Sequence, residues 1–165
     1  MATTTVFDGV VDTDHHQFLL VDPSKPFDPG PEAYGNAVVG VVDDTALIVH
    51  TGCAYGPVRV TLRMHDEQPS GLDHTWEVEE LVSITIDDPL DLVELAMEPR
   101  RHIPYPTVVP SRPGVHRVRV SARGDRKVNY DLAVWEPNEE YLIDLWPDTE
   151  FRTRVTVRDD GLADL

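Results

Sequence analysis

The chain has 165 residues, the length of one domain or two very small ones, and its 41% hydrophobic content is enough for one core. The formal net charge of −16 argues against binding to nucleic acid or anionic membranes, since both need a basic face. No apolar run approaches the roughly 20 residues of a membrane span, and the N-terminus lacks the features of a secretory signal. A single cysteine excludes an internal disulfide, so we expect an acidic cytoplasmic protein.

Prolines and glycines divide the chain into short segments, which leaves little room for long helices. The 14 prolines and 10 glycines lie between runs that alternate in polarity or are rich in β-branched residues, as strands are. The predicted strands are, in chain order, 6–11, 15–21, 36–42, 46–50, 58–64, 75–86, 90–97, 115–121, 141–146 and 152–157. Asp43 and Asp44 suit a tight turn between the third and fourth of these strands.

The segment 90–97 fits two kinds of secondary structure. Asp88 could cap a helix whose first position is Pro89, but the residues that follow also alternate as in a strand. Because the surrounding segments are all predicted strands, we favour a strand here.

Two other segments show how their side chains are expected to divide between faces. In 75–86, Glu79 and Glu80 interrupt the alternation, and one extra residue there would form a β-bulge. The segment 115–121 places His116 and two valines on one side, while its arginines lie on the other. We therefore expect polar groups on both faces of this strand.

Roughly nine or ten strands without βαβ spacing predict an all-β protein, as an antiparallel β-sandwich or barrel. Of these two, we expect a single-domain antiparallel β-sandwich over residues 1–165. Proline-rich loops are predicted near 22–34 and 99–113, and a short polar tail ends the chain.

Residue types that could support catalysis lack the required patterns. Cys53 has no local signature of a catalytic cysteine, and a small buried residue at a strand end explains it better. His65 and His74, with neighbouring carboxylates, flank a predicted turn and could hold Zn²⁺, although such a tip is normally solvated. No nucleophile elbow, phosphate loop or dinucleotide glycine pattern is present. We therefore expect a protein without enzyme activity, cofactor or bound metal.

The charge distribution is the most informative feature of the sequence. Residues 64–99 contain eleven acidic residues and no lysine or arginine, whereas 112–127 is mainly basic. One interpretation is that the two segments are neighbours and neutralise each other. The other is an acidic face that binds a cationic protein, such as a nuclease whose groove holds phosphates. The candidate contact residues, as phosphate mimics, are Glu77, Glu79, Glu80, Asp87, Asp88, Asp91 and Glu94.

Several short motifs resemble the competence protein J family. His16-Gln17-Phe18 is similar to the family's "YHQF" opening, and the run 141–145 resembles its "YIID" strand. The order of loops and strands over about 11–146 is also similar, whereas 103–111, 123–139 and the end of the chain are extra. The resemblance implies an inhibitor of a DNA-entry nuclease, but it supplies no contact residues.

These observations favour a non-enzymatic module that binds a basic protein, as a nuclease inhibitor or an immunity-type protein. The main alternative is a β-sandwich that binds a small molecule or a carbohydrate, with Trp76, Trp135 and Trp146 as stacking surfaces. A third interpretation is a metal-dependent hydrolase that uses His65 and His74.

Overall fold

The computed structural model describes residues 2–30, 34–70, 75–94 and 105–165, and almost all regular structure in them is β-strand. The strands are β1 (Thr3–Asp14), β2 (Gln17–Val21), β3 (Val39–Val42), β4 (Ala46–His50), β5 (Tyr55–His65), β6 (Val78–Ile86), β7 (Leu90–Glu94), β8 (Thr107–Val108), β9 (Gly114–Gly124), β10 (Glu139–Pro147) and β11 (Val155–Arg158). A short 3₁₀-helix, η2 (Leu162–Asp164), follows β11. In these described ranges no helix has the length and apolar character needed to cross a membrane.

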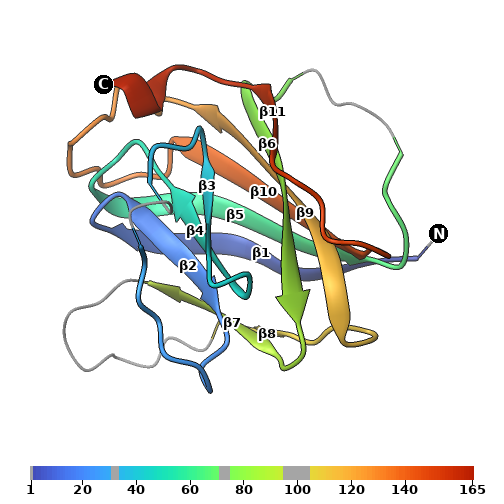
Figure 1. Cartoon of the computed structure of the whole chain (residues 1–165). Helices are drawn as coiled ribbons and strands as arrows, with labels where there is room; N and C mark the ends of the chain where they lie inside the picture. Colours follow the sequence, from blue (N-terminus) through green and yellow to red (C-terminus); the bar gives the residue numbers. More distant parts are fainter. Residues whose placement is uncertain (1, 31–33, 71–74, 95–104) are drawn as a thin grey trace.

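The strands form one mixed sheet in the order β11-β6-β9-β10-β5-β1-β2-β4-β3, with β7 added beside β2 and β8 beside β7. Figure 1 shows that this sheet curls into a half-barrel. The all-β prediction is confirmed. The expected antiparallel sandwich needs correction, because β10 runs parallel to β5 and the described strands belong to one sheet. Long connections bring β10 beside β5, and hairpin reasoning does not anticipate such a pairing.

The longest pairing of the sheet joins β1 to β5. It extends from Thr3 opposite His65 to Asp14 opposite Tyr55, with one register shift between Thr5 and Phe7. By contrast, β6 pairs with β9 without a shift, so the extra residue predicted in β6 at Glu79 and Glu80 is wrong; the register shift opposite these two residues lies in β11, between Thr156 and Arg158. The reason is that Glu80 occupies a regular inward position, where the sequence pattern expects an apolar residue.

The core lies on the inner face of the curled sheet. Val118 and Val120 of β9 are fully buried there, beside His116, as the alternation of 115–121 predicted. Buried valine and isoleucine side chains of β6, β5 and β10 complete this face, and Phe18 contacts Tyr141 edge to face with ring centroids 5.7 Å apart. Apolar burial of this kind is the main stabilising contribution to the fold.

Most strand positions agree with the sequence prediction, and the differences lie at strand ends. Strand β4 has the predicted bounds, and β7 confirms a strand rather than a helix for Leu90–Glu94. The rest of 90–97 lies outside the described residues. The predicted connection 99–113 contains the two-residue strand β8, and its first part, 99–104, is also outside them.

The carboxylate of Glu80 joins the two ends of the sheet. Its Oε1 accepts hydrogen bonds from the backbone N–H groups of Val38, at 2.6 Å, and Val39, at 3.1 Å. Its Oε2 accepts from the Arg154 guanidinium at 3.0 Å and the Thr156 hydroxyl at 2.9 Å. Glu80 therefore connects β3, at one end of the strand order, to β6 and β11 at the other end.

We expect the substitution Glu80→Ala to lower the free energy of unfolding by about 3–5 kcal/mol, because it leaves the half-buried Arg154 and two buried backbone N–H groups without their acceptor. Glu77→Ala, at an exposed position near the start of the same strand, is the control and should change it by about 0.5 kcal/mol or less. Urea unfolding followed by circular dichroism measures both. Equal effects of the two substitutions would contradict the bridging role of Glu80.

Candidate functional site

The structure separates the candidate contact residues of 64–99 into different environments. Glu77 is exposed just before β6, where its carboxylate accepts a hydrogen bond from the Gly124 N–H at 3.3 Å. Glu79 and Glu80 are buried. Because a buried, hydrogen-bonded carboxylate does not face a partner, these two residues do not form part of an acidic surface in this structure.

Glu79 is one point where the acidic and basic segments meet. Strands β6 and β9 are neighbours, and the Arg119 guanidinium lies 3.7 Å from the Glu79 carboxylate. Arg119 also donates to Asp144 of β10 at 2.9 Å. The Glu79 charge is therefore neutralised by the basic segment, as the first interpretation of the charge distribution expects. Among the described residues, the acidic residues that follow β6 are not paired in this way.

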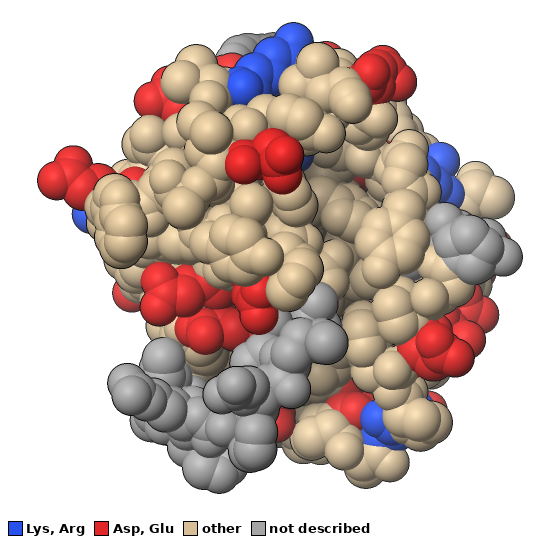
Figure 2. All heavy atoms as spheres, turned by 90° about the vertical axis from the view of Figure 1, so that its left-hand side faces the viewer, with Lys and Arg blue, Asp and Glu red and all other residues tan. Residues whose placement is uncertain are grey.

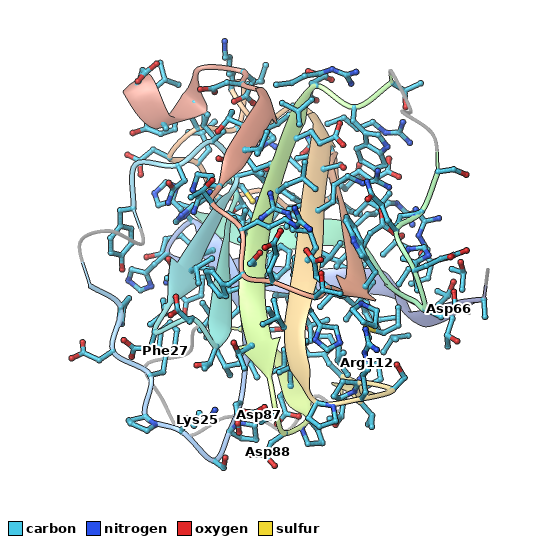
Figure 3. All side chains as sticks on the ribbon, turned by 45° about the vertical axis from the view of Figure 1, so that its right-hand side comes forward. Lys25, Phe27, Asp66, Asp87, Asp88 and Arg112 are labelled. Carbon is cyan, nitrogen blue, oxygen red and sulfur yellow. The ribbon has the colours of Figure 1, made fainter. Side chains whose placement is uncertain are left out.

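Four exposed carboxylates gather at two neighbouring turns, which we call the acidic turns. Asp43 and Asp44 form the β3–β4 turn, and Asp87 and Asp88 begin the β6–β7 turn. A hydrogen bond of 2.7 Å from the Thr85 N–H to the Asp44 carbonyl holds the two turns together. Figure 3 shows Asp87 and Asp88 at the lower end of the molecule. Within the described residues, none of the four carboxylates has a hydrogen-bond or ion-pair partner.

The backbone of the β3–β4 turn explains its residue types. Asp43 and Asp44 have φ values of 50° and 58°, and the Thr45 N–H donates to the Val42 carbonyl at 3.0 Å. These left-handed conformations suit a tight hairpin turn, in which aspartate is tolerated, and three residues lie between the paired Val42 and Ala46. The predicted tight turn is confirmed. Sequence reasoning did not include it in the acidic site, because some forty residues separate it from Asp87.

Asp91 and Glu94 lie on β7, after the acidic turns. Asp91 is half-buried and lies near the Thr107 hydroxyl, at 3.3 Å. Glu94 accepts a hydrogen bond of 2.5 Å from the Tyr105 hydroxyl, and burial together with this carboxylate raises the pKa of Tyr105. Of these two residues, Asp91 is the one next to the acidic turns, because β7 begins directly after them.

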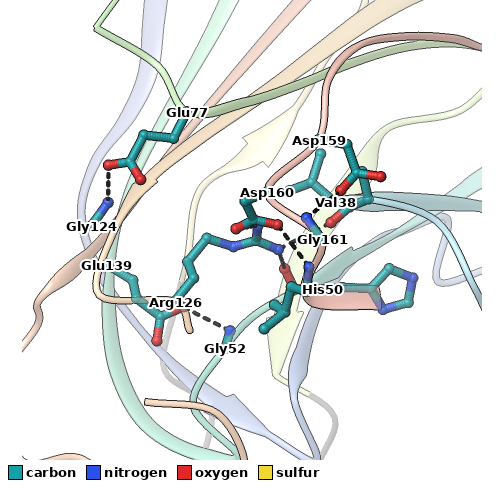
Figure 4. Close-up of polar contacts among 12 residues, drawn as sticks. Val38, His50, Gly52, Glu77, Gly124, Arg126, Glu139, Asp159, Asp160 and Gly161 are labelled. Carbon is teal, nitrogen blue, oxygen red and sulfur yellow. Dashed lines mark hydrogen bonds and ion pairs between the residues drawn. The ribbon is translucent and has the colours of Figure 1, made fainter. Parts of the chain in front are cut away.

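Many of the basic side chains form ion pairs with buried or half-buried carboxylates. Figure 4 shows Arg126, which is fully buried and donates to Asp160 at 2.6 Å and to the His50 carbonyl at 3.3 Å. Arg152 and Arg154 pair with Asp148 and Glu80 in the same way. The surface is left with an excess of acidic groups, and Figure 2 shows several separate red patches and few blue ones on one face.

Two other buried carboxylates organise the sheet. Burial alone would raise the pKa of Glu139, but hydrogen bonds from Tyr141, Asn129 and two backbone N–H groups outweigh burial and lower it. Asp144 also has a lowered pKa, because hydrogen bonds from His65 at 2.7 Å and from Arg119 outweigh its burial. Both carboxylates are therefore ionised at neutral pH, inside the protein.

The remaining candidate residues have structural surroundings. Cys53 is fully buried, as predicted, and burial raises the pKa of its thiol to about 11, which keeps it protonated at neutral pH. Both ring nitrogens of His65 are hydrogen-bonded, to Thr3 and Asp144, and His74 lies outside the described residues. In the part of the chain that is described, no cluster of three potential metal-ligating side chains occurs.

The tryptophans proposed for ligand stacking differ in exposure. Trp76 and Trp146 are buried, and Arg123 covers the ring of Trp76 at 4.2 Å from its centroid. Trp135, on the connection between β9 and β10, is 91% exposed. Only this one of the three side chains is available to a ligand without rearrangement.

These features define the protein as a curled all-β half-barrel with exposed acidic turns. No known sequence family matches the chain, and no curated protein matches it in sequence. Two solved structures share the fold over 90% of this chain and the whole of their own. One is ComJ from Bacillus subtilis, described as an inhibitor of the DNA-degrading activity of NucA, with 10% identity and a TM-score of 0.57. The other, described as crocagin biosynthetic gene J, has 17% identity and a TM-score of 0.54.

The resemblance to the competence protein J family is therefore supported as a distant structural relationship. Identities of 10% and 17% establish a shared fold and leave function to be argued from this chain's own residues.

The lowered pKa values of Glu139 and Asp144 predict acid sensitivity. Their stabilising effect is complete above the unfolded-state pKa of about 4 and is lost as the pH falls through the lower folded-state values. We expect the free energy of unfolding to fall below about pH 5. Asp144→Asn should lower stability at pH 7 by about 3 kcal/mol and reduce its dependence on acid pH. Urea unfolding at pH 7 and pH 4 measures this, and an unchanged pH dependence would contradict it.

Proposed function

We propose that this protein binds a basic protein partner through its acidic turns and acts as an inhibitor of the nuclease-inhibitor or immunity type. One observation carries the proposal: Asp43, Asp44, Asp87 and Asp88 are exposed together at one end of the sheet, without partners among the described residues. Four like charges on two joined turns repel one another, and a cationic partner relieves this repulsion.

The acidic turns are suited to imitate phosphates because their backbones are fixed. The Thr85–Asp44 hydrogen bond holds one turn against the other, and Glu80 ties the strands that carry them. A partner therefore meets carboxylates that lose little conformational freedom on binding. Such a surface speeds association and favours partners with a positive groove, of which a nuclease is the typical example.

The proposal narrows the set of contact residues expected from the sequence. Asp87, Asp88 and Asp91 stay as contacts, joined by the Asp43–Asp44 turn, whereas Glu79 and Glu80 stabilise the sheet. Glu77 lies about 30 Å from Asp87, since β6 rises about 3.3 Å per residue, and it would contact only the rim of such an interface.

The fold of ComJ, a nuclease inhibitor, is consistent with this proposal and motivates a nuclease as the first partner to test. The cytoplasmic location expected from the sequence stays a prediction.

A second candidate function is binding of a carbohydrate or another small molecule, and the exposure of Trp135 favours it. An exposed indole ring stacks on a sugar face. An oligosaccharide that protects Trp135 from acrylamide quenching would support this alternative. Protein binding at the acidic turns predicts no such protection.

Reversing the charge of the acidic turns should remove partner binding. We expect the tagged wild-type protein to retain a basic protein from its own lysate at about 50 mM salt and to release it at about 500 mM, where charges are screened. The double substitution Asp87→Lys and Asp88→Lys should lose the same protein at low salt. Mass spectrometry identifies the retained proteins, and a nuclease assay with the identified partner tests inhibition.

The matched control is Asp8→Lys with Asp66→Lys, which changes the net charge equally at two exposed positions on β1 and after β5. We expect this control to retain the partner. Equal loss in both variants would show a general charge effect, and unchanged binding by the Asp87 and Asp88 variant would contradict the proposal.

A further inference from the structure

A pocket of about 200 Å³ lies at the other end of the β3–β4 hairpin from the Asp43–Asp44 turn. Its wall is formed by residues around the starts of β2 and β3, the end of β4, the β9–β10 connection and η2. Four rings line it, from His16, Tyr34, His50 and Tyr130. A volume of this size fits one amino-acid side chain and is smaller than typical sites for drug-sized ligands.

The four rings form two pairs. His16 and Tyr130 have ring centroids 6.0 Å apart, and Tyr34 and His50 have centroids 6.1 Å apart. Tyr34 and Tyr130 remain 50% and 42% exposed, so both rings are accessible from solvent, and the Tyr130 hydroxyl donates to the Leu165 carbonyl at 3.4 Å. Tyrosine faces carry negative potential, so the two tyrosine rings on this pocket attract a cation.

The backbone around Tyr130 is held in place by buried groups. The Asn129 amide donates to the Glu139 carboxylate at 2.9 Å, and the Asp131 N–H donates to the Gly52 carbonyl at 3.3 Å. Tyr130 therefore lies on a connection whose backbone is fixed on both sides, so a ligand would order little more than its side chain.

The charges around the pocket also favour a cation. The Asp131 carboxylate lies 3.1 Å from His16 Nε2 and is 74% exposed, while Asp164 is exposed on η2. The buried Arg126 beneath the pocket is neutralised by Asp160 at 2.6 Å. Lys127 is exposed, and its ammonium group lies near Gly161, just before η2.

We propose that this pocket binds one cationic side chain, an arginine guanidinium, of the basic partner. The inference rests on the proposed function and deepens it, because it names the group that the partner inserts. The hairpin between the pocket and the Asp43–Asp44 turn is only four to five residues long, about 15 Å, so one standard interface covers both. The acidic turns attract the partner, and the ring-lined pocket fixes its position.

The test uses the full-length protein and needs no partner. N-acetyl-arginine amide is titrated into the labelled protein while NMR follows the ring signals of the tyrosines and histidines. N-acetyl-citrulline amide, a neutral molecule of the same shape, is the control ligand. We expect the arginine compound to shift the Tyr34 and Tyr130 signals and to bind about fivefold to thirtyfold more tightly than the citrulline compound.

Variants separate the pocket from a general charge effect. Tyr130→Leu keeps an apolar side chain and removes one π-face, so it should reduce the preference for arginine over citrulline several-fold, while Tyr34 and the two aspartates maintain the remainder. Trp135→Leu, at an exposed aromatic position that does not line the pocket, should leave the preference unchanged. Absence of ring shifts, equal binding of the two ligands, or an unchanged preference in the Tyr130 variant would overturn the inference.

This result is independent of the capture experiment. If the arginine compound binds but the acidic-turn variant still retains its partner, the turns are excluded as the contact while the pocket stands. If the compound does not bind and the acidic-turn variant loses its partner, the pocket inference fails while the proposed function stands.

Discussion

The curled sheet depends on the buried carboxylate of Glu80. This side chain is 1% exposed, and it accepts hydrogen bonds from two backbone N–H groups at one end of the strand order and from Arg154 and Thr156 at the other. A sheet with two free ends would expose unpaired edge groups, and the carboxylate satisfies several of them at once. The cost of burying a charge is offset because both of its oxygens have donors, one of them cationic.

The hydrogen bonds of Glu80, which join the two ends of the sheet, also position the proposed interaction surface. When the β3–β4 hairpin is tied to β6, its turn comes beside the turn that follows β6, and the Thr85–Asp44 hydrogen bond forms. Four carboxylates that are distant in sequence then lie at one end of the molecule. At the opposite end of the same hairpin, the ring-lined pocket around Tyr130 is supported by Arg126 and Glu139. The buried charged groups thus stabilise the sheet and its connections, whereas the exposed carboxylates are free to contact a partner.

The sequence predicted those features that depend on local patterns. The bounds of β4, the two faces of β9 and the Asp43–Asp44 turn follow from alternation and turn chemistry. The curled mixed sheet and the parallel β5–β10 pair depend on which distant strands meet, and composition contains no signal for this. For the candidate site, Asp87 and Asp88 are exposed, whereas Glu79 and Glu80 are buried beside cations that come from other parts of the chain. The number of acidic residues in a segment of the sequence does not show which of them are exposed and which are buried.

Amide hydrogen exchange, read residue by residue by NMR, tests most directly whether Glu80 joins the two ends of the sheet. We expect the N–H groups of Val38, Val39 and Thr85 to exchange slowly in the wild-type protein. In a Glu80→Ala variant, which removes the acceptor of the Val38 and Val39 N–H groups, these three amides should exchange much faster, while amides of the central strands β5 and β10 keep their protection. Fast exchange at these sites in the wild-type protein, or no change in the variant, would contradict the role of Glu80 in joining the two ends of the sheet.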